Sequence, residues 1–284
     1  MVCFIPVQYK SYRYPAGIKP RLQEVAGHFG KEIVHSTLPL SLHTEYSAGK
    51  RSYSALARQF PALQKSQQHG VPLLWTSSDW ASAFAGFIHS LCQGEPPAVL
   101  EIHPPYWHTC DVDSFFQRFA VFEETFRQWA PQTQIVLENR CGNLLRRRFL
   151  LSTYQDLLQF AHRMESTHSS LRIALDLPQL FTAHRLQEAG RQEKIAPLLN
   201  HLKEIRHCIS SIHLWGNHNG THAHWGNLDT YFSGDQALKQ TFLQALFSCL
   251  DDNVPRYLVP EVNSGQTDFS AIVQDLLAYG FSFL

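Results

Sequence analysis

The chain has 284 residues, of which 24 are basic and 24 acidic, so its formal net charge is zero. Hydrophobic residues make up 44% and charged residues 17%, a composition that fills a sizeable core and excludes intrinsic disorder. A neutral chain has no general electrostatic attraction to nucleic acid or anionic lipid, so neither is an expected partner. No apolar run reaches the ~18 residues that a membrane span needs.

The cysteines and the first residues indicate the compartment. The six cysteines are scattered and form no CxxC pair, which favours reduced thiols over a disulfide framework. Residues 1–6 (MVCFIP) lack the basic and long apolar regions of a secretory signal. Together these features predict a cytoplasmic protein.

Short β-rich runs alternate along the chain with segments of helical periodicity. The expected strands are Val2–Val7, Glu32–Ser36, Pro72–Trp75, Ala98–His103, Gln134–Glu138, Arg172–Asp176, Ile209–Leu214 and Tyr257–Glu261. The expected helices are Ser54–Gln68, Ser78–Leu91, Asp113–Trp129, Thr153–Thr167, Glu193–His207, Ala237–Leu250 and Asp268–Ala278.

This alternation predicts an α/β protein, a (β/α)8 TIM barrel that spans residues 1–284 as a single domain. No linker rich in Pro, Gly or Ser divides the chain. An open, doubly wound sheet is the alternative, and the lack of a Gly-rich phosphate loop after any expected strand disfavours it.

Charged or metal-coordinating residues stand at or next to the ends of five of the later expected strands, namely His103, Glu138, Asp176, His213 and Glu261. In a parallel barrel these strand ends meet at one face, where active sites lie. Three carboxylates can gather in a closed mouth only if a cation neutralises them or they take up protons. The residues therefore predict one divalent metal ion, and the oxygen and nitrogen donors suit Mn, Zn, Mg, Co or Fe.

These strand ends resemble the xylose isomerase-like TIM-barrel superfamily, which includes sugar isomerases and epimerases and the endonuclease IV-type apurinic endonucleases (AP endonuclease family 2). The resemblance runs from about Ala98 to the C-terminus. The superfamily's metal set is Glu, Asp, His and Glu in that order. By position the matching residues are Glu138 in Leu-Glu-Asn-Arg, Asp176 in Leu-Asp-Leu-Pro-Gln, His213 in Ile-His-Leu-Trp and Glu261 in Pro-Glu-Val-Asn.

The leading hypothesis is a metal-dependent isomerase or epimerase that acts on a carbohydrate. In such epimerases the cation holds two substrate oxygens while two glutamates remove and return a proton. The resemblance thus makes Glu138 and Glu261 the catalytic acid/base pair. Gln179 stands where many epimerases have a histidine, and glutamine cannot carry a proton. The expected substrate-binding residues are His103, Arg140, Gln179, Trp215 and His222.

Two other hypotheses remain open. His103, followed by Pro104-Pro105, resembles a second-metal ligand of the endonuclease branch, which would share Glu138, and His222 resembles a third-metal ligand. The second hypothesis is therefore a metal-dependent phosphodiesterase acting on abasic DNA. Three of the branch's usual ligand positions are replaced here, at Trp75-Thr-Ser-Ser78, Gln179 and Gly220. The third hypothesis is a barrel that binds a ligand without turnover, and because such barrels often pair, a homodimer is expected.

Overall fold

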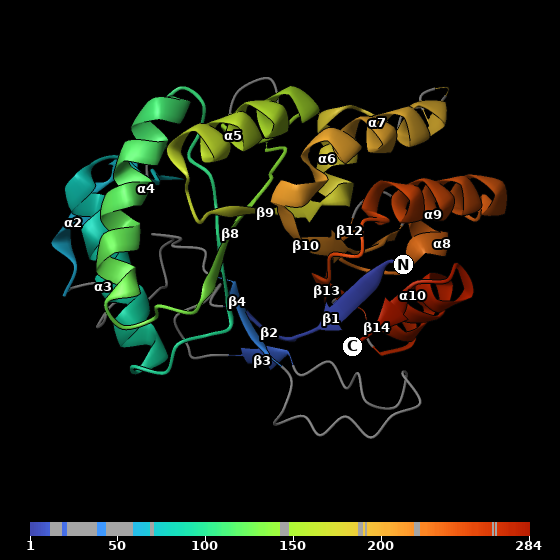
Figure 1. Cartoon of the computed structure of the whole chain (residues 1–284), viewed down its shortest axis with the longest axis horizontal. Coiled ribbons are helices and arrows are strands. Elements are labelled where there is room, and N and C mark those ends of the chain that lie inside the picture. Colours follow the sequence, from blue (N-terminus) through green and yellow to red (C-terminus); the bar gives the residue numbers. More distant parts are fainter. Residues whose placement is uncertain are drawn as a thin grey trace.

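The computed structural model describes residues 1–11, 19–21, 39–43, 59–68, 71–142, 148–186, 190, 192–218, 222–262, 264 and 266–284. A ten-stranded curled sheet lies at the centre, and helices pack around its outside (Figure 1). Its strand order is β14-β1-β13-β10-β9-β8-β7-β4-β2-β3, and every pairing is parallel except β2 with β3. The predicted alternating α/β architecture is therefore confirmed.

The bounds of the sheet strands are as follows: β1 (Cys3–Pro6), β2 (Gln8–Ser11), β3 (Lys19–Arg21), β4 (Leu40–His43), β7 (Val99–Ile102), β8 (Gln134–Glu138), β9 (Arg172–Asp176), β10 (Ile209–Leu214), β13 (Arg256–Pro260) and β14 (Ser282–Phe283). Two separate two-residue ladders pair β5 (Gln67–Gln68) with β6 (Val71–Pro72) and β11 (Asn217–His218) with β12 (His222–Ala223). Only Val7 separates β1, which pairs with β13, from β2, which pairs with β4. One continuous backbone segment thus pairs with β13 on one side of the sheet and with β4 on the other.

The α-helices are α2 (Pro61–Lys65), α3 (Ser78–Cys92), α4 (Val112–Arg127), α5 (Tyr154–Thr167), α6 (Leu177–Ala183), α7 (Ile195–His201), α8 (Leu228–Tyr231), α9 (Gln236–Leu250) and α10 (Gln266–Ala278). The 3-10 helices η3 (Gln192–Lys194) and η4 (Leu202–Cys208) flank α7. No helix in the described ranges is both long enough and apolar enough to cross a bilayer.

Helix α4 shows how the sequence sets the outer layer. Asp111 caps its first turn, since the carboxylate accepts a 2.7 Å hydrogen bond from the Ser114 amide. Phe115, Phe119 and Phe122 recur at helical spacing and are at most 1% exposed. They pack in the core with α3, as the predicted helix Asp113–Trp129 requires.

Several predicted elements differ in the structure. The strand expected at Pro72–Trp75 is wrong: Val71–Pro72 belongs to the antiparallel β5–β6 ladder, and Trp75 leaves extended backbone with φ 57°. Burial explains the departure, because the Trp75 indole is fully buried and packs edge-on against Phe115. The strand beside β7 is instead β4. The strand expected at Glu32–Ser36 lies outside the described residues.

The single helix expected at Glu193–His207 is also wrong, because the segment divides into η3, α7 and η4. Pro197 explains the break at the start, since proline is tolerated only in the first turn of a helix and α7 begins two residues before it. Part of the expected Ser54–Gln68 helix lies outside the described residues, and α2 is the part that is described.

Candidate metal centre

Strand alternation places a layer of polar residues above an apolar layer inside the curled sheet. The lower layer includes Val99, Val136 and Ala174. Two residues further along the same strands lie Glu101, Glu138 and Asp176, each at most 2% exposed. Residues i and i+2 of a strand share a face. The carboxylates therefore lie inside the sheet, toward its carboxyl end.

The structure brings together the four residues that the strand ends suggested. Glu138, Asp176, His213 and Glu261 each offer one donor atom, and these atoms all lie within 4.8 Å of one another. Each residue is at most 5% exposed. Glu138, Asp176 and His213 lie on β8, β9 and β10, while Glu261 directly follows β13. This group can hold a metal ion.

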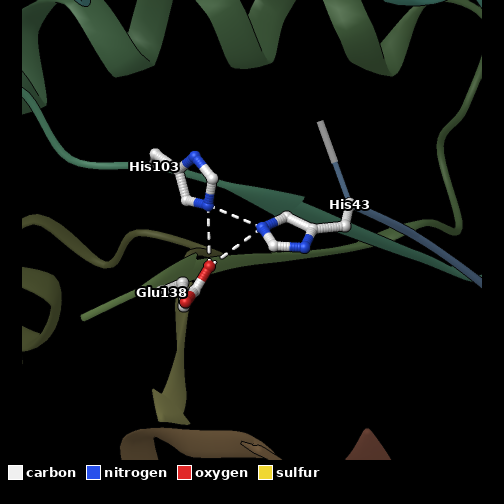
Figure 2. Close-up of side chains that lie close together, drawn as sticks. All are labelled: His43, His103 and Glu138. Carbon is white, nitrogen blue, oxygen red and sulfur yellow. Dashed lines mark hydrogen bonds and ion pairs between the residues drawn. The ribbon is translucent and has the colours of Figure 1, made fainter. Parts of the chain in front are cut away.

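A second group shares Glu138 with the first. His43, His103 and Glu138 point toward one another from β4, the loop after β7 and the end of β8 (Figure 2). Glu138 Oε2 lies 2.7 Å from His103 Nε2 and 2.9 Å from His43 Nε2. The two imidazole nitrogens are 2.6 Å apart. This group could also hold a metal ion, and Glu138 belongs to both groups.

His43 is the member of the centre that sequence reasoning missed. Its Nδ1 lies 3.2 Å from Glu261 Oε1, so it contacts a residue of each group. The sequence pattern that marks this strand is short, since β4 has only four residues. The histidine at the end of the alternating run Leu40–His43 could have indicated a ligand at a strand end.

Buried imidazole nitrogens indicate that the donor set fits a cation. Within the described residues, His213 Nδ1 is buried without a hydrogen-bond partner, and Glu261 Oε2 lies 3.8 Å from it. A buried nitrogen of this kind costs free energy unless something pairs with it. The nearest carboxylate oxygen to Nε2 is Glu101 Oε2 at 2.7 Å, and the other Glu101 oxygen accepts a 2.6 Å hydrogen bond from Ser41. A neighbouring carboxylate that fixes the histidine ring is common beside metal ligands.

Shifted pKa values indicate how protons offset the negative charge of the buried carboxylates when no metal ion is bound. Burial and the nearby Glu138 raise the pKa of Asp176 well above its usual range. Burial alone would lower the pKa of His43, but Glu138 and Glu261 raise it to about 10. His213 likewise has a raised pKa: burial opposes its charged form, but Glu101 outweighs that effect. Protons thus offset part of the buried negative charge.

Metal binding is therefore expected to release protons. His43, whose pKa is raised to about 10, holds a proton at neutral pH and must lose it to coordinate. The raised pKa values of Asp176 and His213 favour their protonated forms in the same way. Metal affinity should rise with pH, and about one proton or more should leave for each ion bound. Calorimetric titration in two buffers of different ionisation enthalpy counts the protons. An identical heat in both buffers would contradict this prediction.

The chain around Asp176 fixes the orientation of its carboxylate. Oδ1 accepts a 2.8 Å hydrogen bond from the Gln179 amide at the start of α6, and Oδ2 accepts one of 3.0 Å from the Trp215 indole. Trp215 is only 4% exposed and its ring lies 4.4 Å from that of His224. The role of Trp215 in binding substrate stays a prediction. In the structure its indole N–H donates to Asp176.

Replacing Trp215 by phenylalanine is expected to weaken metal binding by about 10–100-fold, the usual cost of losing a hydrogen bond to a ligand. The ring remains, so packing changes little, but Asp176 Oδ2 loses its donor. Competition with a chelating dye measures the affinity. Trp225→Phe is the matched control, because Trp225 is 48% exposed. Equal affinity in the two variants would refute the orienting role.

The other expected substrate-binding residues lie around the centre. His103 is 3% exposed and belongs to the second group. Arg140 Nη1 lies 3.3 Å from His103 Nδ1, and its guanidinium carbon lies 5.4 Å from the Phe149 ring centroid. Gln179 Oε1 accepts hydrogen bonds from the amide and thiol of Cys141 at 3.2 and 2.8 Å. The His222 side chain lies outside the described part of the structure.

Burial and Arg140 lower the pKa of His103, which favours its neutral, coordinating form. Burial opposes ionisation of Glu138 and Glu261, yet contacts with histidines hold both pKa values well below the usual range. The two glutamates are thus ionised at neutral pH. Such carboxylates are good metal ligands and weak proton acceptors.

Comparisons with known proteins do not assign the chain to a family. No protein-family model matches it, and no curated protein matches it. Among solved structures, a crystal structure of a protein from Sinorhizobium meliloti 1021 is similar at 11% sequence identity and a TM-score of 0.37. The match covers 85% of this chain and 78% of that one.

Proposed function

We propose that the protein is a metal-dependent hydrolase of phosphoesters whose centre holds two divalent cations. The observation that carries this proposal is the position of Glu138, which belongs to both ligand groups. Paired cations that share a carboxylate suit phosphoryl chemistry, since they stabilise the attacking and the leaving oxygen together. We further propose that the curled sheet closes into the expected (β/α)8 TIM barrel, because the β1–β2 segment pairs with both flanks.

The bound cations would supply Lewis acidity and make water more acidic at neutral pH. Glu138 and Glu261 hold negative charge at the two positions, consistent with their lowered pKa values. Arg140 brings a permanent positive charge to the edge of the second group and suits a phosphoryl oxygen. Gln179, whose Oε1 is occupied by Cys141, presents its amide NH2 as a donor.

A small phosphoester suits the chain better than duplex DNA does. The chain has a formal net charge of zero, whereas affinity for DNA depends chiefly on many contacts between basic side chains and phosphates. Arg148, in the chain's basic run, is already paired with Asp156. An abasic oligonucleotide nevertheless belongs among the test substrates, because it separates the DNA hypothesis from that of a small substrate.

A sugar isomerase or epimerase is the second candidate. The first group alone, with Glu138 and Glu261 as ligands, can serve a one-metal reaction on a carbohydrate. The lowered pKa values of both glutamates disfavour it, since a general base works best with a pKa near the operating pH. Exchange of the carbon-bound proton of ketoses in deuterated water would favour this candidate.

Hydrolysis of bis(4-nitrophenyl) phosphate and 4-nitrophenyl phosphate by the Mn- or Zn-loaded protein tests the proposal. We expect metal-dependent release of nitrophenol that falls to background in Glu138→Gln, which keeps the side-chain size but weakens a shared ligand. Glu95→Gln, at an exposed position, is the control and should retain activity. Failure to cleave any phosphoester, together with ketose proton exchange, would overturn the proposal.

A further inference from the structure

A second cluster of metal-ligating side chains lies at the opposite end of the sheet. Cys208 directly precedes β10, and His207 comes just before it at the end of η4. Glu165 lies in the last turn of α5, shortly before β9. These residues are therefore at the amino ends of the parallel strands, whereas the centre described above is at their carboxyl ends.

The three residues are close enough to share one ion. One donor atom from each lies within 4.8 Å of the other two. His207 Nε2 and Glu165 Oε1 are 2.6 Å apart, and both side chains are about half exposed, with relative accessibilities of 55% and 52%. Cys208 is 4% exposed and not in a disulfide. Its sulfur lies within 4.8 Å of a donor atom of His207 and of Glu165.

We propose that Glu165, His207 and Cys208 form a separate site for a zinc-like divalent cation. Thiolate, imidazole and carboxylate are the donors that Zn²⁺ accepts, and three protein ligands leave a fourth position for water. Sulfur disfavours Mg²⁺ and Ca²⁺, which take oxygen ligands. The open side, formed by the exposed His207 and Glu165, gives the ion a path to the buried sulfur.

The chemistry of Cys208 explains why a cation would change this cluster. Burial and the nearby Glu165 raise the pKa of the Cys208 thiol, so the sulfur stays protonated by itself. A coordinated cation deprotonates a thiol outright. The ion would then join the end of α5 to the start of β10. This inference stands independently of the proposed hydrolase activity.

Cobalt titration of the reduced, metal-free protein tests the site, because a thiolate bound to Co²⁺ gives a sulfur-to-cobalt charge-transfer band. The carboxyl-end centre has only oxygen and nitrogen donors and gives no such band. We expect the band in the wild-type protein and in the Glu138→Ala/Glu261→Ala double variant. It should disappear in Cys208→Ser and persist in Cys141→Ser, the control for the cysteine nearest the main centre.

His207→Ala provides a second test, because this exposed side chain can be removed without opening the core. Cobalt affinity read from the band should fall at least about tenfold in this variant. Absence of the band from the wild-type protein, its persistence in Cys208→Ser, its loss in Cys141→Ser, or unchanged affinity in His207→Ala would each overturn the proposal.

Discussion

Replacing Glu138 by alanine should remove both cations of the proposed centre at once. Glu138 is the one residue that the two ligand groups share, and its Oε2 lies within 2.9 Å of both His43 and His103. The loss should bring phosphoester hydrolysis to background, because neither position keeps its bridging carboxylate. Elemental analysis should find the metal content falling from about two ions per chain to near zero, the pair that such centres hold.

Single-group variants make the result specific. Asp176→Ala removes a ligand of the first group only, and His103→Ala one of the second group only. Each should leave about one ion, consistent with a two-metal centre. All variants are compared in a Cys208→Ser background, so that an ion at the amino-end cluster is not counted. Retention of an ion in Glu138→Ala would contradict the shared role of Glu138.

Replacing Arg256 by methionine should lower the free energy of unfolding by about 3–5 kcal/mol, the cost of breaking a buried ion pair from one side. The Arg256 side chain is 1% exposed, and its Nη1 and Nη2 donate to the two oxygens of Asp252 at 2.9 and 2.6 Å. Its Nε donates to the Ile209 carbonyl at 3.0 Å. The substitution leaves the Asp252 carboxylate and this carbonyl without their buried partner.

Denaturant unfolding measures the effect, and the thermal midpoint should fall by roughly 2–4 °C for each kcal/mol lost. Arg206→Met is the matched control, because Arg206 contacts the same carboxylate at 3.5 Å with a side chain that is 34% exposed. A partly exposed pair contributes at most about 1 kcal/mol. Similar losses in both variants would refute the special role of Arg256.

The later strands could be predicted from the sequence because each carries its own signal. Strands β8, β9 and β10 have the predicted bounds, and all three are buried on both faces. β8 and β9 read as apolar runs that end in a carboxylate, while β10 has His213 just before its last residue. Strand β4 has four residues and too little pattern to stand out. The apolar residues around Trp75 predict a strand, but burial of its indole holds Trp75 in a loop.

The site residues that could be predicted are those that stand at the carboxyl end of a strand with a clear sequence pattern. Glu138, Asp176, His213 and Glu261 follow from that rule and lie together. His43 did not, because its position depends on the pairing of β4 with β7. Contacts between side chains of different strands, such as the Trp215 indole on Asp176, are set by tertiary packing and have no local sequence signal.

Anomalous diffraction from crystals grown with Mn²⁺ or Zn²⁺ tests most directly that Glu138 joins two metal positions. We expect two anomalous peaks about 3.5–4 Å apart, both beside Glu138 and one of them also beside His43 and His103. A single peak beside Glu138, or none, would contradict the two-metal centre.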